Sequence, residues 1–398
     1  MSRLLIVSER WWPDGTGGVL ASHLIAGLLQ DMGFRLTVVH GTREPLRLNG
    51  VRYVYSSLLS VRDKHRLWLN CSILAREHWF RKLISRSDVV YIPRLCYPLV
   101  PVVKGLGKRV IVHLHDYQPI SYNAVVLKND DRIIPKGFLD AVKLEVLQHG
   151  SILRALGAMT APLNSFCRLW LKDADAIICV SKRQAELISK LVPELASKLK
   201  VIYNPLPDIP FVEKEISSPT FLYLGGDSYF KGFDIFLKAS QEILKKGYPA
   251  NFLLAGTFKK RGSKSAISVL NKKFNGVFNL WGYIPYKEVS RLHSRSCALL
   301  FPSICEEPLP YAVMESMVMG TMPVASRVGG VPEIVGGTFA ERLMYKPNDV
   351  SELTEQIEYV LSISREQLTN ISLSLRENVL KRFNRESVKE ELVKAFLG

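Results

Sequence analysis

Several features that mark other protein classes are missing from this sequence of 398 residues. The six cysteines form no C-x-x-C pair, which argues against a zinc site or a disulfide framework and favours reduced thiols in a cytosolic core. The N-terminal apolar run is too short for the core of a signal peptide. No apolar run approaches the ~20 residues of a membrane span, and the nearest candidate, 151–171, is broken by Arg154, Pro162, Asn164 and Arg168. We therefore expect a cytoplasmic protein that can also lie peripherally on the cytoplasmic face of a membrane.

Acidic residues are scarce in the first half of the chain. Residues 1–200 carry 29 Lys and Arg against 16 Asp and Glu, a net charge of +13. Residues 201–398 carry 24 against 21, a net charge of +3. The basic first half suggests an anionic partner, which is a nucleic acid, an acidic lipid surface or a phosphorylated acceptor.

Short apolar runs rich in β-branched residues alternate with helical patterns along the chain. The first series comprises 4–7, 36–39, 51–55, 89–92, 110–115, 176–180 and 201–203, and the second comprises 221–226, 252–256, 277–283, 298–302 and 322–326. Such alternation predicts parallel sheets covered by helices on both faces. A proline-rich link separates the two series, so we predict two α/β domains, 1–205 and 206–383. Ligands are expected at the turns that follow the carboxyl ends of the strands.

Two such turns in the first series carry candidate ligand contacts. Gly17 and Gly18 precede a helix, where backbone amides can approach a phosphate, although a plain glycine turn explains them equally well. The strand 110–115 ends with His113 and His115 on one face, and no third ligand follows at zinc spacing. We interpret His115 as a polar substrate contact and His113 as a structural histidine.

In the second series, a glycine turn from Gly225 to Gly232 follows a strand and precedes a helix. Its amides, including that of Gly226, and the Lys231 ammonium suit a diphosphate at a helix N-terminus. The spacing is not that of a P-loop, because Lys231 is followed by glycine. A solvent-exposed lysine after a turn is the alternative.

The segment 301–315 leaves a buried strand, crosses a short loop and enters a helix. Glu307 lies in the loop, and Glu315 lies in the helix among apolar residues. A carboxylate in an apolar stretch needs hydrogen-bond donors, which two vicinal ribose hydroxyls can supply. The alternative, a surface glutamate, is disfavoured by the apolar neighbours. The turn at Gly329 and Gly330 is expected to present backbone amides to the same site.

Together these turns resemble glycosyltransferase family 4, the glycosyl transferases group 1, over nearly the whole chain. The matching motifs are E-x7-E at Glu307 and Glu315, G-G-x-P-E at Gly329, Gly330, Pro332 and Glu333, K-G at Lys231 and Gly232, the glycine loop at Gly17 and Gly18, and H-D at His115 and Asp116. Asp175 and Ser181 match the family's A-D-x-I-x-x-V-S strand, so we interpret the D-x-D spacing of Asp173 and Asp175 as structural. The resemblance implies the GT-B fold, with two Rossmann-like, doubly wound parallel-sheet domains facing across a cleft. It also implies that the last helix, 384–398, packs back on the N-terminal domain.

The resemblance further implies a metal-independent, retaining hexosyltransferase that needs no cofactor and takes a nucleotide-diphosphate sugar as donor. Glu315 is implied to hold the ribose, Lys231 the diphosphate and Glu307 the hydroxyls of the donor sugar. His115 is implied to lie beside the anomeric centre. The other implied donor-binding positions are Gly17, Gly18, Gly226, Leu309, Pro310, Tyr311, Arg327 and Gly330.

Two positions depart from the family's pattern. Relatives often carry arginine five residues before the lysine, where this chain has Gly226, and Arg327 is a candidate replacement. Relatives also often carry glycine three residues after the first glutamate, where Pro310 has no N–H to offer the donor. Both departures bear on the identity of the donor more than on the class of reaction.

Residues 62–86 predict an amphipathic helix with a basic face. Its apolar residues at near-helical spacing are Leu69, Ile73, Phe80, Leu83 and Ile84, with Trp68 and Trp79 near the boundary. Such a helix can lie on an anionic membrane, where each basic residue contributes about 1 kcal/mol. A domain helix with a solvated basic face is the alternative. With the charge imbalance, the pattern favours membrane contact and a glycan or a polyprenyl- or lipid-phosphate-linked acceptor.

Two other functions fit parts of the sequence. Gly226 and Pro310 leave open a catalytically weak GT-B-like protein that binds a nucleotide sugar. The net charge of +16 alone suggests nucleic-acid binding, but the sequence has no recognisable nucleic-acid motif. We therefore expect no specific nucleic-acid partner.

Overall fold

The computed structural model describes residues 2–129, 132–133, 138–149 and 156–397, and the chain forms two compact units. Unit 1 comprises the chain up to Ala124, Pro162–Pro207 and the chain from Phe383. Unit 2 comprises Val125–Ala161 and Asp208–Arg382. The sequence analysis placed 125–161 in the first domain, whereas the structure groups this segment with unit 2, because its start pairs with a loop of that unit.

Unit 1 is built on a seven-stranded parallel sheet of order β3-β2-β1-β4-β5-β8-β9. The strands are β1 (Arg3–Ser8), β2 (Arg35–His40), β3 (Arg52–Tyr55), β4 (Val89–Ile92), β5 (Arg109–Leu114), β8 (Ala176–Cys179) and β9 (Leu199–Val201). The helices are α1 (Gly17–Asp31), α2 (Lys64–Leu74), α3 (His78–Arg86), α4 (Leu99–Gly105), α7 (Ser165–Leu171), α8 (Lys182–Leu191), η2 (Pro193–Lys198) and α16 (Arg385–Leu397). The central strands are buried on both faces, which explains their continuous apolar runs.

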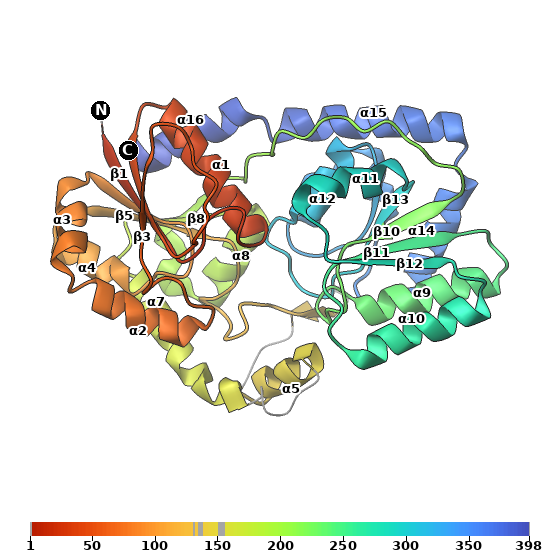
Figure 1. Cartoon of the computed structure of the whole chain (residues 1–398), viewed down its shortest axis with the longest axis horizontal. Helices are drawn as coiled ribbons and strands as arrows, with labels where there is room; N and C mark the ends of the chain where they lie inside the picture. The colour runs from red at the N-terminus through yellow and green to blue at the C-terminus, as the bar shows by residue number, and fades with distance from the viewer. Residues whose placement is uncertain (1, 130–131, 134–137, 150–155, 398) are drawn as a thin grey trace. The chain divides into compact units, whose positions relative to one another are not determined.

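Helix α16 completes the core of unit 1 from the far end of the sequence. Its Val388, Leu392 and Phe396 join the same apolar cluster as residues of α1, and Figure 1 shows the red α1 beside the blue α16. The Phe396 ring meets Tyr91 of β4 edge-on, with centroids 5.3 Å apart.

Unit 2 contains a six-stranded parallel sheet of order β12-β11-β10-β13-β14-β15. The strands are β10 (Thr220–Tyr223), β11 (Asn251–Ala255), β12 (Phe278–Gly282), β13 (Ala298–Phe301), β14 (Met322–Ser326) and β15 (Met344–Tyr345). The helices are α9 (Phe233–Lys245), α10 (Arg261–Lys273), η3 (Tyr286–Glu288), α11 (Val289–Ser294), α12 (Tyr311–Val318), α13 (Val331–Val335), η4 (Phe339–Leu343), α14 (Val350–Ser362) and α15 (Arg365–Arg382). In Figure 1, α9 and α10 lie on one side of this sheet and α12 on the other.

The segment between the two parts of unit 1 adds a small hairpin and further helices. They are β6 (Lys128–Asn129), β7 (Arg132–Ile133), α5 (Phe138–His149) and η1 (Leu156–Asn164), which runs across the boundary between the units. The chain between β5 and β8 therefore contains an insertion that the apolar periodicity of the sequence did not predict.

Residues 62–86 form two helices, so the prediction of a single helix is wrong. Helix α2 starts at the cap Asp63, whose carboxylate accepts from the Arg66 N–H at 2.8 Å, and a new helix, α3, starts after Glu77. The expected apolar face is divided, because Phe80 and Ile84 are buried whereas Leu69 and Ile73 are exposed.

Among the described residues, no helix has both the length and the apolar composition that crossing a bilayer requires. All six cysteines are buried free thiols.

Candidate functional site

A lysine and a glutamate meet at the carboxyl end of β13 in unit 2. The loop 302–310 after β13 carries Glu307, whose Oε1 accepts hydrogen bonds from Lys231 Nζ at 2.6 Å and from Ser303 Oγ at 2.8 Å. Strands β10 and β13 are neighbours in the sheet, so the turns that follow them lie together. Desolvation acts to lower the pKa of Lys231, but the Glu307 carboxylate opposes it, and the pKa lies above its ordinary value. Such a charged pair can bind a phosphate oxygen and a hydroxyl at one place.

Glu315 is a buried carboxylate on α12 that accepts a hydrogen bond from a tyrosine. Its side chain is 6% exposed, and Oε1 accepts from the Tyr286 hydroxyl at 2.5 Å. Burial raises the pKa of Glu315 to about 7, although the Tyr286 hydrogen bond acts in the opposite direction. The sequence predicted that a ligand supplies the donors that Glu315 needs, and the structure shows that the protein supplies one of them.

The amides of the Gly329-Gly330 turn fix the Glu307 loop. The Gly330 N–H donates to the Glu307 carbonyl oxygen at 2.8 Å, and the Gly329 N–H donates to the Glu306 carboxylate. The expectation that these amides face a ligand is therefore wrong. The turn acts on the site by holding the backbone beneath Glu307.

Gly226 occupies a backbone position that no other residue fits. Its φ is +58°, and a Cβ there would lie 2.5 Å from the Thr257 carbonyl oxygen. Its N–H donates to the Ala255 carbonyl oxygen at 3.2 Å, so this amide is not available to a diphosphate either. In this conformation of the turn, an arginine at position 226 would clash with the Thr257 backbone.

The remaining predicted positions of unit 2 surround the same loop. Leu309, Pro310 and Tyr311 are buried where the loop enters α12, and Pro310 is the N-cap of that helix. Arg327 is exposed after β14, and its backbone carbonyl oxygen accepts from Lys128 Nζ at 2.7 Å. No hydrogen bond joins the Arg327 side chain to Lys231 or Glu307 in the described structure.

The start of the 125–161 segment lies alongside the Glu307 loop. The Glu306 N–H donates to the Val126 carbonyl oxygen at 2.8 Å, and the Lys128 N–H donates to the Ile304 carbonyl oxygen at 3.0 Å. The Lys128 side chain thereby comes close to the loop, a placement that the sequence analysis missed. A pairing of two or three residues has no periodic pattern that a sequence could reveal.

In unit 1, the first turn of α1 packs against the end of β5. A Cβ at Gly18 would lie 2.9 Å from both Arg94 Nη1 and His115 Cβ, so glycine permits this approach. Arg94 Nε donates to Glu9 Oε1 at 2.7 Å, which places a buried ion pair beside the helix start. In the described structure the Gly17 and Gly18 amides have no protein acceptor, as expected for a first helical turn, and can receive an anion.

Two stacked histidines lie next to this turn. The His113 and His115 rings have centroids 4.3 Å apart, and Tyr91 bonds His113 Nδ1 at 2.7 Å. Burial lowers the pKa of His113 to about 3, and burial, then His113 and then Arg94, lower that of His115 well below its ordinary value. His113 is structural, as predicted. The buried His115 Nε2 has no hydrogen-bond partner among the described residues, so a neutral imidazole nitrogen remains for a ligand.

Asp175 makes structural contacts, in agreement with the structural interpretation of this residue. Its carboxylate accepts from the Val110 N–H and from Lys104 Nζ, both at 2.7 Å. These contacts tie the starts of β8 and β5 together, at the opposite end of the strands from His115.

Sequence reasoning missed four side chains of these clusters: Glu9, Arg94, Ser303 and Tyr286. Glu9 and Arg94 follow β1 and β4 closely, so the strand-end rule, applied to every charged residue, would have found them. Ser303 and Tyr286 have no comparable signal, because loop hydroxyls are common on any surface.

Two family models match consecutive parts of the chain. The model described as Glycosyltransferase Family 4 matches residues 17–208, and the model described as Glycosyl transferases group 1 matches residues 208–377. The chain belongs to glycosyltransferase family 4. Together with the two parallel-sheet units, this membership establishes a transferase of the GT-B fold.

Individual relatives are distant from this glycosyltransferase. An uncharacterized glycosyltransferase of Methanocaldococcus jannaschii is 24% identical over 316 residues, which are 74% of this chain and 76% of that protein. One chain of the human phosphatidylinositol N-acetylglucosaminyltransferase is 27% identical over 175 residues, which are 43% of this chain and 36% of that protein. The crystal structure of Anabaena HepE in complex with UDP and glucose superposes with a TM-score of 0.67 at 16% identity, covering 99% of each chain. That likeness shows the fold.

Proposed function

We propose that this glycosyltransferase moves a hexose from a nucleotide-diphosphate sugar to a glycan or lipid-linked acceptor. The observation that carries the proposal is the Lys231–Glu307 pair at the carboxyl end of β13, with the buried Glu315 on the helix that follows. The similar HepE structure contains UDP and glucose, which agrees with a nucleotide-sugar donor.

Each charged group of unit 2 is suited to one part of the donor. Lys231 offsets the charge of the diphosphate, and Glu307 accepts from hydroxyls of the sugar while Ser303 holds its carboxylate. Glu315 accepts from the ribose hydroxyls once Tyr286 gives way or shares the carboxylate. With Lys231 as the counter-charge of the leaving diphosphate, the proposed reaction uses no metal ion.

Unit 1 carries backbone amides and a neutral imidazole that suit a sugar phosphate. The Gly17 and Gly18 amides bind donor phosphate or sugar, and the His115 Nε2 contacts the donor sugar near its anomeric carbon. We further propose retention of configuration, with the acceptor hydroxyl attacking the face from which the diphosphate leaves and the leaving phosphate taking the proton. Product anomers resolved by NMR test this step, and an inverted linkage would refute it.

Donor screening followed by hydrolysis tests the main proposal. We expect one of the UDP, GDP and ADP sugars to stabilise the protein by roughly 2.7 kcal/mol at 100 times its dissociation constant. Slow hydrolysis of that donor should disappear in Glu307→Ala, persist in the exposed control Glu366→Ala and be indifferent to EDTA. Hydrolysis that survives in Glu307→Ala would remove this glutamate from the site.

The positions Gly226, Pro310 and Gly330 favour one other function. None of them offers the donor a side-chain charge or a free N–H, so the second candidate is a protein that binds a nucleotide sugar with little turnover. Tight donor binding without hydrolysis or transfer across acceptors would support that candidate.

Unit 1 also carries a surface suited to an anionic membrane. Trp68 of α2 meets Trp170 of α7 edge-on at 5.1 Å, so the two helices lie side by side. Their outer faces expose Leu69, Ile73, Phe166 and Leu169, and the exposed cations of α2 and α3 and between them include Arg66, Arg76 and Lys82. We propose that this face rests on the cytoplasmic surface of a membrane that holds a lipid-linked acceptor. The name of the human relative includes phosphatidylinositol, which is an anionic membrane lipid.

Vesicle co-sedimentation tests the membrane proposal. Anionic vesicles should bind the protein at low salt, neutral vesicles should not, and Leu69→Ser with Phe166→Ser should weaken binding. Leu373→Ser, an exposed leucine of unit 2, is the matched control. Absence of binding to anionic vesicles at low salt would refute the membrane proposal.

A further inference from the structure

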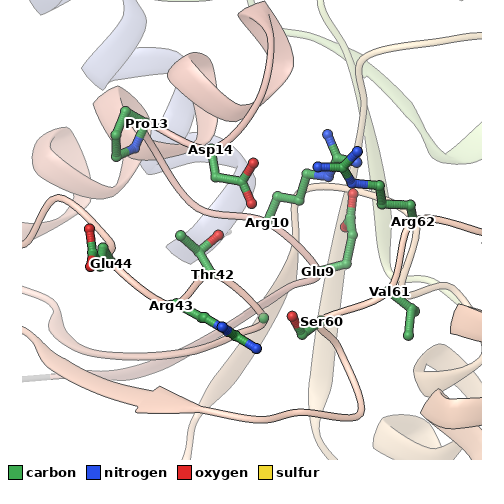
Figure 2. A pocket seen from close by; sticks show the side chains of 11 residues that line it. Glu9, Arg10, Pro13, Asp14, Thr42, Arg43, Glu44, Ser60, Val61 and Arg62 are labelled. Atoms are coloured by element: carbon green, nitrogen blue, oxygen red, sulfur yellow. The ribbon is translucent and has the colours of Figure 1, made fainter.

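Unit 1 contains a cavity of about 480 Å³ that includes none of the predicted site residues. It opens where β1 and β2 end, and its charged lining comprises Glu9, Arg10, Asp14, Arg43, Glu44 and Arg62 (Figure 2). Its volume lies within the roughly 300–1,000 Å³ range of small-molecule sites. Three guanidinium groups, those of Arg10, Arg43 and Arg62, line this one cavity.

None of the three arginines has a hydrogen-bond or ion-pair partner for its side chain among the described residues. Arg10 is half-buried and Arg43 and Arg62 are exposed, and each comes from a different turn. Figure 2 shows the Arg10 and Arg62 side chains extending toward each other. Unpaired like charges facing one another repel, and an anion between them removes the repulsion. Arg94, by contrast, is neutralised by Glu9 within the protein.

The cavity also presents acceptors for hydroxyl groups. Glu9 is 4% exposed; its Oε1 pairs with Arg94, and its buried Oε2 has no hydrogen-bond partner among the described residues. A buried carboxylate oxygen without a donor is costly, and a ligand hydroxyl would satisfy it. The exposed Asp14 and Glu44 lie at the same cavity. Guanidinium groups bind phosphate or carboxylate in a bidentate manner, whereas carboxylates accept from sugar hydroxyls.

The Glu9–Arg94 ion pair links this cavity to the residues assigned to the reaction. Arg94 Nη1 lies against the Gly18 position, which in turn lies against His115. A molecule that contacts Glu9 would therefore be separated from the first turn of α1 only by the Arg94 side chain.

We propose that this cavity binds the acceptor and that the acceptor is a sugar carrying a phosphate or carboxylate group. Arg10, Arg43 and Arg62 hold the anionic group, and Glu9 Oε2 receives a hydroxyl of the sugar. The inference rests on the proposed transferase function and adds to it the chemical class of the acceptor.

Calorimetric titration of the full chain with defined probes tests the inference. The probes are glucose 6-phosphate, glucose 1-phosphate, glucuronate, glucose and inorganic phosphate. At least one anionic sugar should bind tenfold or more tightly than both glucose and inorganic phosphate, and added salt should weaken its binding. Binding by the phosphates but not by glucuronate, or the reverse, would identify the anionic group.

Two variants locate the site. Arg43→Gln with Arg62→Gln should weaken binding of the anionic sugar about tenfold or more, because two charge-assisted contacts are lost. Arg52→Gln, an exposed arginine of β3 outside the cavity, should bind as the wild type does. Because the changed side chains are exposed, circular dichroism and the melting temperature should not move.

Several results would overturn the inference: equal binding of glucose and its phosphates, no binding of any anionic sugar, or unchanged affinity in the double variant. The rate of donor hydrolysis, measured in the same preparations, distinguishes failure of the acceptor inference from failure of the transferase proposal. A protein that hydrolyses donor but binds no anionic sugar refutes only the acceptor class. A protein that binds the anionic sugar at these arginines without accepting any donor refutes the transferase proposal and leaves the anion site standing.

Discussion

Replacing Glu315 with glutamine should stabilise the protein at alkaline pH and leave its stability unchanged in acid. Burial raises the pKa of this carboxyl from an ordinary value of 4.5 to about 7 in the folded protein. Below pH 4.5 the group is protonated in both the folded and the unfolded chain, so it carries no ionisation cost. As the pH rises from 4.5 to 7 the unfolded chain ionises first, and the folded wild type loses stability. Above pH 7 the loss is complete and constant.

The size of the effect follows from the same two pKa values. At 1.36 kcal/mol per pH unit, the difference between 4.5 and 7 corresponds to about 3 kcal/mol of lost stability. Glutamine keeps the shape and an oxygen acceptor for Tyr286 but cannot ionise. The Glu315→Gln protein should therefore match the wild type at pH 4.5 and exceed its unfolding free energy by about 3 kcal/mol at pH 8.

Urea unfolding at half-unit steps between pH 4.5 and pH 8.5 measures this difference. Hydrogen exchange of peptides from 311–318 keeps the readout on unit 2, and Glu366→Gln, on the exposed face of α15, is the control. If the gap between wild type and Glu315→Gln is the same at pH 5 and at pH 8, the carboxyl is not the buried acid described here and the reasoning fails.

The remaining predictions concern donor binding and the turns around it. Hydrogen bonds from donor hydroxyls favour the charged form of Glu315. The affinity for the donor, measured by calorimetric titration, should therefore rise between pH 6 and pH 8 in the wild type and stay constant in Glu315→Gln. Lys231→Gln should weaken nucleoside diphosphate binding about tenfold, whereas Lys238→Gln on the exposed face of α9 should not change it. Gly226→Arg, which restores the family's residue, should lower the unfolding free energy by at least 1–2 kcal/mol in urea, because the backbone there is left-handed and the added Cβ would lie 2.5 Å from the Thr257 carbonyl oxygen. Asp175→Ala should lower the unfolding free energy by about 1 kcal/mol and leave donor affinity unchanged with and without Mg²⁺. A loss of affinity that depends on Mg²⁺ would instead indicate that Asp173 and Asp175 bind a metal ion.

The sequence was sufficient to predict the fold because buried parallel strands leave long apolar runs. The runs at 36–39, 89–92 and 298–302 appear in the structure as interior strands, each paired on both sides. It was also sufficient to select Lys231 and Glu307, since both follow such strands. Their direct contact depends on β10 and β13 being neighbours, which is a property of strand order and not of either turn.

The failures have two physical causes, which are helix caps that override the apolar spacing and tertiary partners that a local pattern does not report. The spacing in 62–86 fits a single helix, but two helices start at the caps Asp63 and Glu77, and only part of the expected apolar face is buried. The glycine pair at 329–330 has the composition of a ligand-binding turn, yet Glu306 and Glu307 already occupy its amides. Local capping therefore explains the first failure, and a partner distant in sequence explains the second.

The pairing of Val126 and Lys128 with the loop 304–306 has a consequence for how the protein is made. The ribosome releases these two residues long before their partners, and the Glu307 loop lacks its backbone hydrogen bonds until both parts of the chain have emerged. A gene fragment that begins at the proline-rich link, at residue 208, would encode the whole six-stranded sheet and still leave two bonds of that loop unmade. A cut at the proline-rich link would therefore separate the Glu307 loop from Val126 and Lys128, which pair with it.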